Sequence, residues 1–149
     1  MKYALIGCGR IATNHIKAVL NNGLELVAVC DIVPEHMETL LAKHGLENEA
    51  SILRYTDYRK LLAQHPELEL VAIATESGLH AQIALACIDA GVNVIIEKPI
   101  AMCMADADEI IRRSKEKGVT VCACHQNRFN VAVQKTRQAL EAGRFGRLS

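Results

Sequence analysis

The segment Glu97-Lys98-Pro99 places a carboxylate and an ammonium directly after the apolar run Val92–Ile96. A short apolar run of this kind is typical of a buried strand. In an open parallel sheet, ligands bind at the carboxyl ends of the strands. There, Lys98 could stabilise a developing alkoxide as an ammonium, or take part in proton transfer as a neutral amine. We favour the electrostatic role over both proton transfer and the usual solvated lysine.

A second group of residues, Gly7-Cys8-Gly9-Arg10-Ile11-Ala12, follows the first apolar run of the chain. It fits the G-x-G-x-x-A pattern: the first glycine allows a tight turn, and the second lets backbone N–H groups approach a pyrophosphate. Arg10, Ile11 and Ala12 then open a helix whose amino end favours an anion. The motif precedes a second strand that ends in an acid, and this context predicts dinucleotide binding rather than a plain tight turn.

Asp31 stands 19 residues after Ala12, at the end of the predicted strand Leu24–Cys30. An acid at about this spacing hydrogen-bonds the adenosine ribose hydroxyls in dinucleotide-binding units. Its charge would repel a 2′-phosphate, so NAD is expected as the cofactor and NADP is disfavoured. The alternative is an exposed aspartate in the turn before Pro34.

Predicted strands alternate with predicted helices along the whole chain, which favours an α/β fold with a doubly wound, mostly parallel sheet and helices on both faces. The expected strands are Lys2–Ile6, Leu24–Cys30, Ser51–Tyr55, Leu70–Ala74, Val92–Ile96 and Val119–Cys124. The expected helices are Ile11–Asn22, one from Pro34 to Gly45, one after Asp57 as N-cap, Leu79–Ala90, Ala105–Lys117 and Asn130–Ala142.

We expect residues 1–124 to form a Rossmann domain, and 125–149 to be a loop and helix leading into a second α/β domain outside this chain. Gly143 is predicted to stop the last helix, and the residues after it resemble the opening of another strand.

Composition excludes several classes of function. Lys+Arg and Asp+Glu are 17 each, and no basic run is interleaved with aromatic residues, which argues against nucleic acid as a partner. No apolar run approaches the roughly 20 residues of a membrane span, and no signal peptide is visible, so we expect a cytoplasmic protein.

The six cysteines lack the spacing of a metal site or a disulfide framework, so we expect structural thiols and no metal. His15, in the first helix, is expected to be a hydrogen-bonded helix-face residue rather than a ligand.

The Gly-x-Gly-x-x-Ala start, the segment Thr75-x-x-x-Leu79-His80 and Glu97-Lys98-Pro99 occur in an order and spacing that resemble the Gfo/Idh/MocA oxidoreductase family. The resemblance covers essentially the whole chain, as the amino-terminal Rossmann domain of that family. It implies that Thr75, His80, Glu97 and Lys98 line the cofactor and its nicotinamide end. Glu76 and Ser77 stand where many members have Pro and Asn.

The segment His125-Gln126-Asn127-Arg128-Phe129, together with Thr75–Gly78, resembles the group of bacterial UDP-N-acetyl-2-amino-2-deoxyglucuronate dehydrogenases within that family. The resemblance implies NAD-dependent oxidation of a sugar 3-hydroxyl, with Gln126, Asn127 and Arg128 facing the nucleotide sugar. Amides can hydrogen-bond sugar hydroxyls, and arginine can hold a carboxylate or phosphate bidentately. The alternative is a polar patch that only leads from the strand into the last helix.

We therefore expect part of an NAD-dependent dehydrogenase of the CH–OH class, with Lys98 as the catalytic residue. The family implies that the remaining acid/base residue, usually a histidine, lies in the second domain, and that the full-length protein is a homo-oligomer. The chain alone is expected to bind NAD weakly and to be inactive. The alternative is a free-standing nucleotide-binding or redox-sensing module without catalysis, which a reading frame ending at Ser149 would favour.

Overall fold

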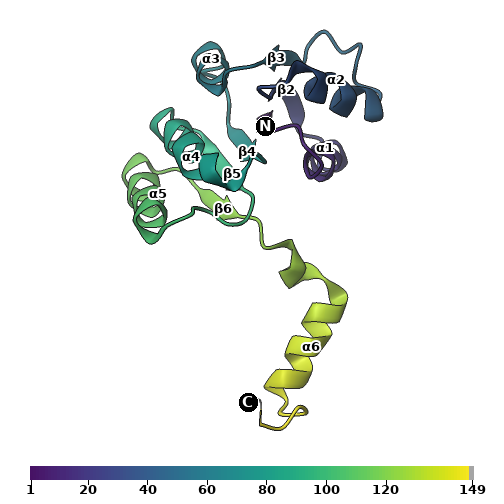
Figure 1. Ribbon diagram of the computed structural model, residues 1–149, viewed down its shortest axis with the longest axis vertical. Coiled ribbons are helices and arrows are strands. Elements are labelled where there is room, and N and C mark those ends of the chain that lie inside the picture. The colour runs from purple at the N-terminus through teal and green to yellow at the C-terminus, as the bar shows by residue number, and fades with distance from the viewer. Residues whose placement is uncertain (148–149) are drawn as a thin grey trace.

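The computed structural model describes residues 1–147, in which six parallel strands form one sheet (Figure 1). The strand order is β3-β2-β1-β4-β5-β6, and every neighbouring pair is parallel. The strands are β1 (Lys2–Ile6), β2 (Glu25–Cys30), β3 (Leu53–Tyr55), β4 (Leu70–Ile73), β5 (Asn93–Ile96) and β6 (Val121–Ala123). The predicted doubly wound α/β fold is confirmed.

Helices follow the strands in the predicted order (Figure 1). They are α1 (Ala12–Asn21), α2 (Pro34–Lys43), α3 (Tyr58–Gln64), α4 (His80–Asp89), α5 (Met104–Lys117) and α6 (Val131–Glu141), with short 3-10 helices η1 (Ser77–Leu79) and η2 (Gln126–Phe129). Asp57 caps α3 as predicted, because its side chain accepts a hydrogen bond from the Arg59 backbone N–H.

Side chains that alternate along the strands enter two cores, one on each face of the sheet. Tyr3 and Leu5 of β1 belong to the core beneath α1 and α2. Ala4 and Ile6, one position away, belong to the core beneath α3, α4 and α5. Because both faces are covered, the carboxyl edge of the sheet is left to receive a ligand.

The sheet reverses its winding between β1 and β4, the two central strands. In doubly wound sheets the crevice at this switch point is the usual ligand site. Gly7 follows β1 and Ala74 follows β4, and the Ala74 N–H donates to the Ile6 carbonyl at 2.7 Å. The loops after these strands therefore begin side by side at the predicted edge.

The strand predicted over Val119–Cys124 is shorter in the structure, because α5 extends its hydrogen bonding into it. Gly118 has φ +68°, its N–H donates to the Lys115 carbonyl, and the Val119 N–H donates to the Ser114 carbonyl. This is the Schellman arrangement that ends helices. It holds Val119 with the helix and delays β6 to Val121.

The expectation that the cysteines are buried structural thiols is only partly right. Cys8, Cys30 and Cys87 are buried, whereas Cys103 and Cys122 are exposed and Cys124 is partly exposed. Cys122 lies on β6, an edge strand. A strand at the edge of the sheet leaves part of its surface uncovered, so the apolar pattern alone overestimated burial there.

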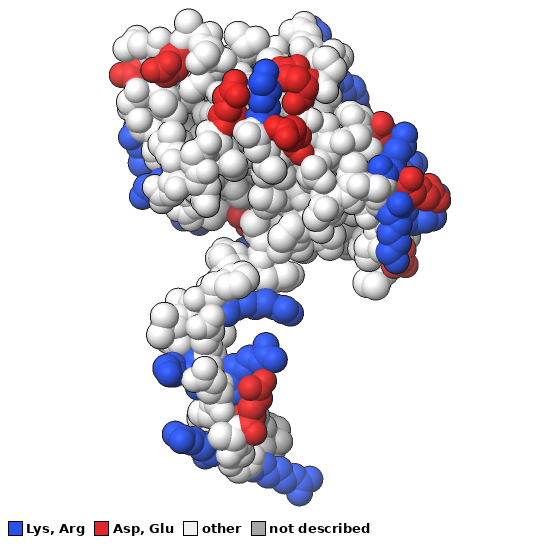
Figure 2. Space-filling view, turned by 180° about the vertical axis from the view of Figure 1, so that it is seen from behind, with Lys and Arg blue, Asp and Glu red and all other residues white. Residues whose placement is uncertain are grey.

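Residues 125–147 extend away from the sheet and carry α6, none of whose residues is buried (Figure 1). Figure 2 shows mixed charges over the body of the molecule and mostly basic side chains along this segment. The basic residues are Arg128, Lys135, Arg137, Arg144 and Arg147, against one acid, Glu141. The predicted domain boundary after residue 124 stays a prediction.

The helix stop predicted at Gly143 is present: α6 ends at Glu141, and Gly143 has φ +68°. Residues 144–147 form a turn and irregular chain rather than a strand, and the rest of the strand expected there lies outside the described residues. No helix within residues 1–147 has the length and apolar character needed to cross a membrane.

Candidate functional site

The loop after β1 has the backbone geometry that the G-x-G-x-x-A pattern predicts. Gly7 has φ +96°, and a Cβ added there would lie 2.5 Å from the Ala74 carbonyl carbon. Both observations require glycine at this position. Gly9 differs, because a Cβ there would meet nothing within 4 Å. Gly9 thus lies on open surface, where a ligand can approach the backbone closely.

Ala12 is completely buried at the start of α1, which allows helix and strand to pack closely. The amino end of α1, with Arg10 and Ile11 before it, opens into a cavity of about 460 Å³. Neither α1's cap residue nor its first turn supplies a capping carboxylate. The helix end is therefore available to an anion such as a pyrophosphate.

Asp31 is held at the end of β2 by the glycine loop. Its carboxylate accepts hydrogen bonds from the backbone N–H groups of Cys8, at 2.8 Å, and Val33, at 2.9 Å, and lies 3.2 Å from His36 Nδ1. The side chain is only 11% exposed. Asp31 is thus fixed in position rather than free in a turn, and a carboxylate has further lone pairs for ribose hydroxyls.

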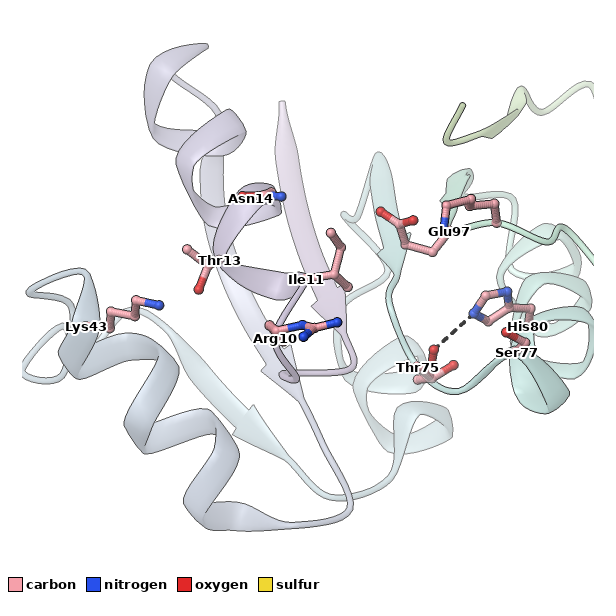
Figure 3. A pocket seen from close by; sticks show the side chains of 10 residues that line it. Arg10, Ile11, Thr13, Asn14, Lys43, Thr75, Ser77, His80 and Glu97 are labelled. Atoms are coloured by element: carbon pink, nitrogen blue, oxygen red, sulfur yellow. Dashed lines mark hydrogen bonds between the residues drawn. The ribbon is translucent and has the colours of Figure 1, made fainter. Parts of the chain in front are cut away.

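Two cavities meet at Thr75, at the carboxyl edge of the sheet. One, of about 360 Å³, is bordered by Gly7, Gly9 and Asp31, with apolar side chains such as Val33 and Leu79 around them. The larger one has a more polar lining (Figure 3): Arg10, Ile11, Thr13, Asn14, Lys43, Thr75, Ser77, His80, Glu97 and Lys98. Two adjoining cavities of this kind suit a dinucleotide: the apolar one suits a base, and the polar one suits the charged and hydroxyl-bearing parts of the molecule.

His80 connects the loops that follow β4 and β5. Its ring is fully buried, with Nδ1 2.7 Å from the Pro99 carbonyl oxygen and Nε2 3.1 Å from the Thr75 carbonyl oxygen. Figure 3 shows the contact with Thr75. A ring nitrogen that carries a proton donates to the carbonyl it faces. His80 therefore positions Thr75 and the Glu97–Pro99 loop while bordering the larger cavity.

Glu97 and Lys98 follow β5, as predicted, and both border the larger cavity. The Glu97 carboxylate lies 3.1 Å from His15 Nε2, and both side chains are about nine-tenths buried. Lys98 is exposed, and within residues 1–147 its ammonium makes no ion pair. Glu97 is thus held by the protein, whereas the ammonium is left for a ligand.

Cys124 adds a thiol to this corner of the site. Burial, and then the nearby charge of Glu97, raise the pKa of the Cys124 thiol to about 11, so at neutral pH it is protonated. Burial likewise raises the pKa of the Cys8 and Cys30 thiols to about 12, with Asp31 as the next cause. None of these three thiols carries the negative charge of a reactive thiolate.

Gln126, Asn127 and Arg128 follow β6 in η2, at the predicted edge of the sheet, but all three are exposed and none borders either cavity. The structure thus brings together the predicted cofactor residues and Lys98, and leaves the predicted substrate residues apart from them.

Sequence reasoning did not connect His15 with Glu97, 82 residues away, although His15 was correctly expected to be hydrogen-bonded. It also missed Thr13, Asn14 and Lys43 as cavity residues. For Thr13 and Asn14 the sequence does offer a signal, because they follow the glycine motif directly, in the first turn of α1. Lys43 has no local signal, since only the packing of α2 beside α1 brings it there.

Residues 1–125 match the sequence profile of the Gfo/Idh/MocA family, described as an oxidoreductase family with an NAD-binding Rossmann fold. The chain belongs to this family. The match and the geometry agree on the dinucleotide site, and the Gfo/Idh/MocA resemblance seen in the sequence is confirmed.

Relatives within the Gfo/Idh/MocA family have varied substrates. The chain is 31% identical over 144 residues to a 4-carboxy-2-hydroxymuconate-6-semialdehyde dehydrogenase from Sphingobium, covering 96% of this chain and 44% of the relative. It is 28% identical over 149 residues to inositol 2-dehydrogenase from Salmonella typhimurium, covering 98% and 43%.

Among solved structures, the WlbA dehydrogenase from Bordetella pertussis in complex with NADH and UDP-GlcNAcA matches with a TM-score of 0.84 and 36% identity. The match covers 99% of this chain and 44% of that one. The WlbA enzyme from Chromobacterium violaceum, also with NADH and UDP-GlcNAcA, matches with a TM-score of 0.84 and 32% identity. The chain thus spans less than half the length of the relatives it matches.

Proposed function

We propose that the whole protein is an NAD-dependent dehydrogenase that oxidises a ring secondary alcohol of a nucleotide sugar. The observation that carries the proposal is the shared cavity in which the amino end of α1 and Arg10 face Glu97 and Lys98. An anion-binding helix end, and an ammonium with no ion-pair partner among residues 1–147, suit a dinucleotide cofactor beside a reacting hydroxyl.

The residues present fit NAD. Gly9 leaves open space for the backbone to approach a pyrophosphate, and the fixed Asp31 carboxylate offers acceptors for ribose hydroxyls. When bound, NAD accepts the hydride that leaves the carbinol carbon. The same carboxylate opposes a 2′-phosphate, because two like charges at close range repel, and this favours NAD over NADP.

The chain's own residues account for the charge that develops on the substrate. As hydride leaves carbon, the hydroxyl also gives its proton to a base, which we propose lies in the part of the protein outside this chain, and negative charge grows on oxygen. The Lys98 ammonium stabilises that charge. His80 holds the Pro99 carbonyl and so fixes the loop that carries Lys98. The hydrogen bond from His15 fixes Glu97 beside it.

For the substrate, we propose a UDP-N-acetylglucosaminuronate-type sugar, oxidised at its 3-hydroxyl. Similarity to the two WlbA structures supports this class. So does Arg128, an exposed guanidinium in η2 just after β6, because arginine suits a carboxylate or phosphate.

The test is NADH formation by the whole protein with NAD and UDP-N-acetylglucosaminuronate, UDP-N-acetylglucosamine or myo-inositol. We expect kcat/KM to be at least about tenfold higher for the uronate, because a charge-assisted bond to its carboxylate contributes about 1.5–3 kcal/mol. Arg128→Met should remove this preference, whereas Lys135→Met, an exposed change on α6, should keep it. Faster turnover of myo-inositol would overturn the substrate class. No turnover of any substrate despite NAD binding would favour a binding module.

A further inference from the structure

Three candidate metal ligands from distant parts of the chain converge beside the larger cavity, which one of them, Glu97, borders. His15 comes from α1, Glu97 follows β5 and Cys124 follows β6. One ligand atom from each side chain lies within 4.8 Å of the ligand atoms of the other two. Among the described residues 1–147, this is the one group of three or more His, Cys, Asp or Glu side chains that lie this close together. Because all three side chains are at least partly buried, the cluster is distinct from the scattered surface acids.

The three groups are an imidazole nitrogen, a carboxylate oxygen and a cysteine sulfur, which are the ligand types that zinc takes in proteins. Three protein ligands with a fourth position open is the composition of accessible zinc sites. Glu97 borders the larger cavity, so the open position would face it.

We propose that His15, Glu97 and Cys124 bind one zinc ion, and that this ion competes with NAD. The second clause rests on the function proposed above. The zinc site departs from the sequence-based expectation of no metal. That expectation considered only the spacing of the cysteines, whereas these three ligands become neighbours only through packing.

The distances require little rearrangement. Zinc–ligand bonds of about 2.0–2.3 Å in a tetrahedron place ligand atoms about 3.5 Å apart. His15 Nε2 and Glu97 Oε1 are already 3.1 Å apart, and the remaining pairs are within 4.8 Å. Adjustments of side-chain torsions therefore complete the site without movement of the sheet.

Binding exchanges protons for the metal. The Cys124 thiol loses its proton to solvent as the sulfur–zinc bond forms. His15 also gives up the Nε2 proton that it donates to Glu97, and binds zinc through Nε2 as the neutral ring with a proton on Nδ1. The carboxylate of Glu97 exchanges its hydrogen bond from His15 for a bond to zinc. No bond changes oxidation state, so the step needs no oxidant or reductant.

The competition with NAD follows from charge and space. A Glu97 carboxylate at the edge of the cavity favours the positively charged nicotinamide ring of the oxidised cofactor. A zinc ion with Glu97 and the Cys124 thiolate leaves the cluster neutral. The ion and its fourth ligand also occupy the wall of the cavity that the cofactor needs.

Cobalt(II) provides a spectroscopic test, because it adopts zinc-like geometry and absorbs in the near ultraviolet when bound to a thiolate. The metal-free whole protein is titrated with cobalt, then with zinc to displace it. We expect one thiolate-to-cobalt band that saturates at one ion per chain. Cys124→Ser should abolish the band, and His15→Gln should weaken cobalt binding at least about tenfold. The matched control, Cys122→Ser, removes an exposed thiol two residues away and should leave the band unchanged.

Circular dichroism of each variant confirms that it is folded. A band that survives in Cys124→Ser but disappears in Cys122→Ser would overturn the site, as would the absence of a band in the folded wild-type protein.

Calorimetric NAD titration with and without saturating zinc tests the competition. Zinc should weaken NAD binding at least about tenfold in the wild-type protein and leave Cys124→Ser unaffected. Equal NAD affinity with and without zinc, in a protein that gives the cobalt band, would overturn the competition alone. Failure of the metal-free protein to bind NAD would overturn the proposed function and leave the cobalt result standing.

Discussion

Replacing Lys98 with methionine is expected to lower kcat of the whole protein by about 10²–10³-fold, the usual effect of removing one group that stabilises a developing oxyanion. The ammonium at the end of β5 borders the cavity and has no ion-pair partner among the described residues, so its charge is free to act on the substrate. NAD affinity should change much less, because the glycine loop and Asp31 remain. The measurement is steady-state NADH formation together with calorimetric NAD binding.

Lys60→Met is the matched control, since Lys60 is an exposed lysine of α3 that borders neither cavity. It should retain wild-type kcat. Unchanged kcat in Lys98→Met would contradict the role assigned to the ammonium. A rise in KM with kcat intact would reduce Lys98 to a binding contact that acts equally on the ground and transition states.

The second large effect is on stability: Gly7→Ala should cost about 3 kcal/mol or more of the free energy of unfolding. The added methyl would lie 2.5–2.6 Å from backbone atoms of Ala74 and Thr75, and the residue would be held at φ +96°. A left-handed conformation costs a non-glycine residue about 1–2 kcal/mol, and forced overlap in a packed region adds about 1–3 kcal/mol. Urea denaturation of both proteins measures the difference.

Gly9→Ala separates folding from binding at the neighbouring glycine. Its Cβ would meet no atom within 4 Å, and its φ is not in the left-handed range, so stability should stay within about 0.5 kcal/mol of wild type. NAD affinity should nevertheless fall, because the methyl occupies the surface where a pyrophosphate would approach the backbone. Equal stability losses in the two variants would show that the two glycines do not have the separate roles proposed.

Local patterns were sufficient to predict the elements of this fold. The apolar runs predicted six strands, and Asp57 and Gly143 marked helix ends that the structure confirms. The rule that parallel strands meet at one edge also placed Gly7, Asp31 and Glu97 near a common crevice, since each follows a predicted strand directly.

Contacts between distant segments could not be predicted in the same way. The His15–Glu97 hydrogen bond joins residues 82 apart. The motifs named Thr75, His80 and Pro99, but they did not show that the His80 ring is fully buried between the carbonyls of the other two. The exposure of Cys122 depends on β6 being an edge strand, which the local pattern does not reveal. These features come from strand order and helix packing, and so need the three-dimensional structure.

The central claim, that the glycine loop and Asp31 form an NAD site, is tested most directly by calorimetric titration of the protein with NAD and NADP under identical conditions. The Asp31 carboxylate is nine-tenths buried and fixed by two backbone N–H groups, so it cannot turn away from a 2′-phosphate without losing both bonds. We predict that NAD binds at least about tenfold more tightly than NADP, since like charges about 4 Å apart near a protein surface repel by about 4 kcal/mol and tenfold corresponds to about 1.4 kcal/mol. Tighter binding of NADP would contradict the role of Asp31, and binding of neither would contradict the site itself.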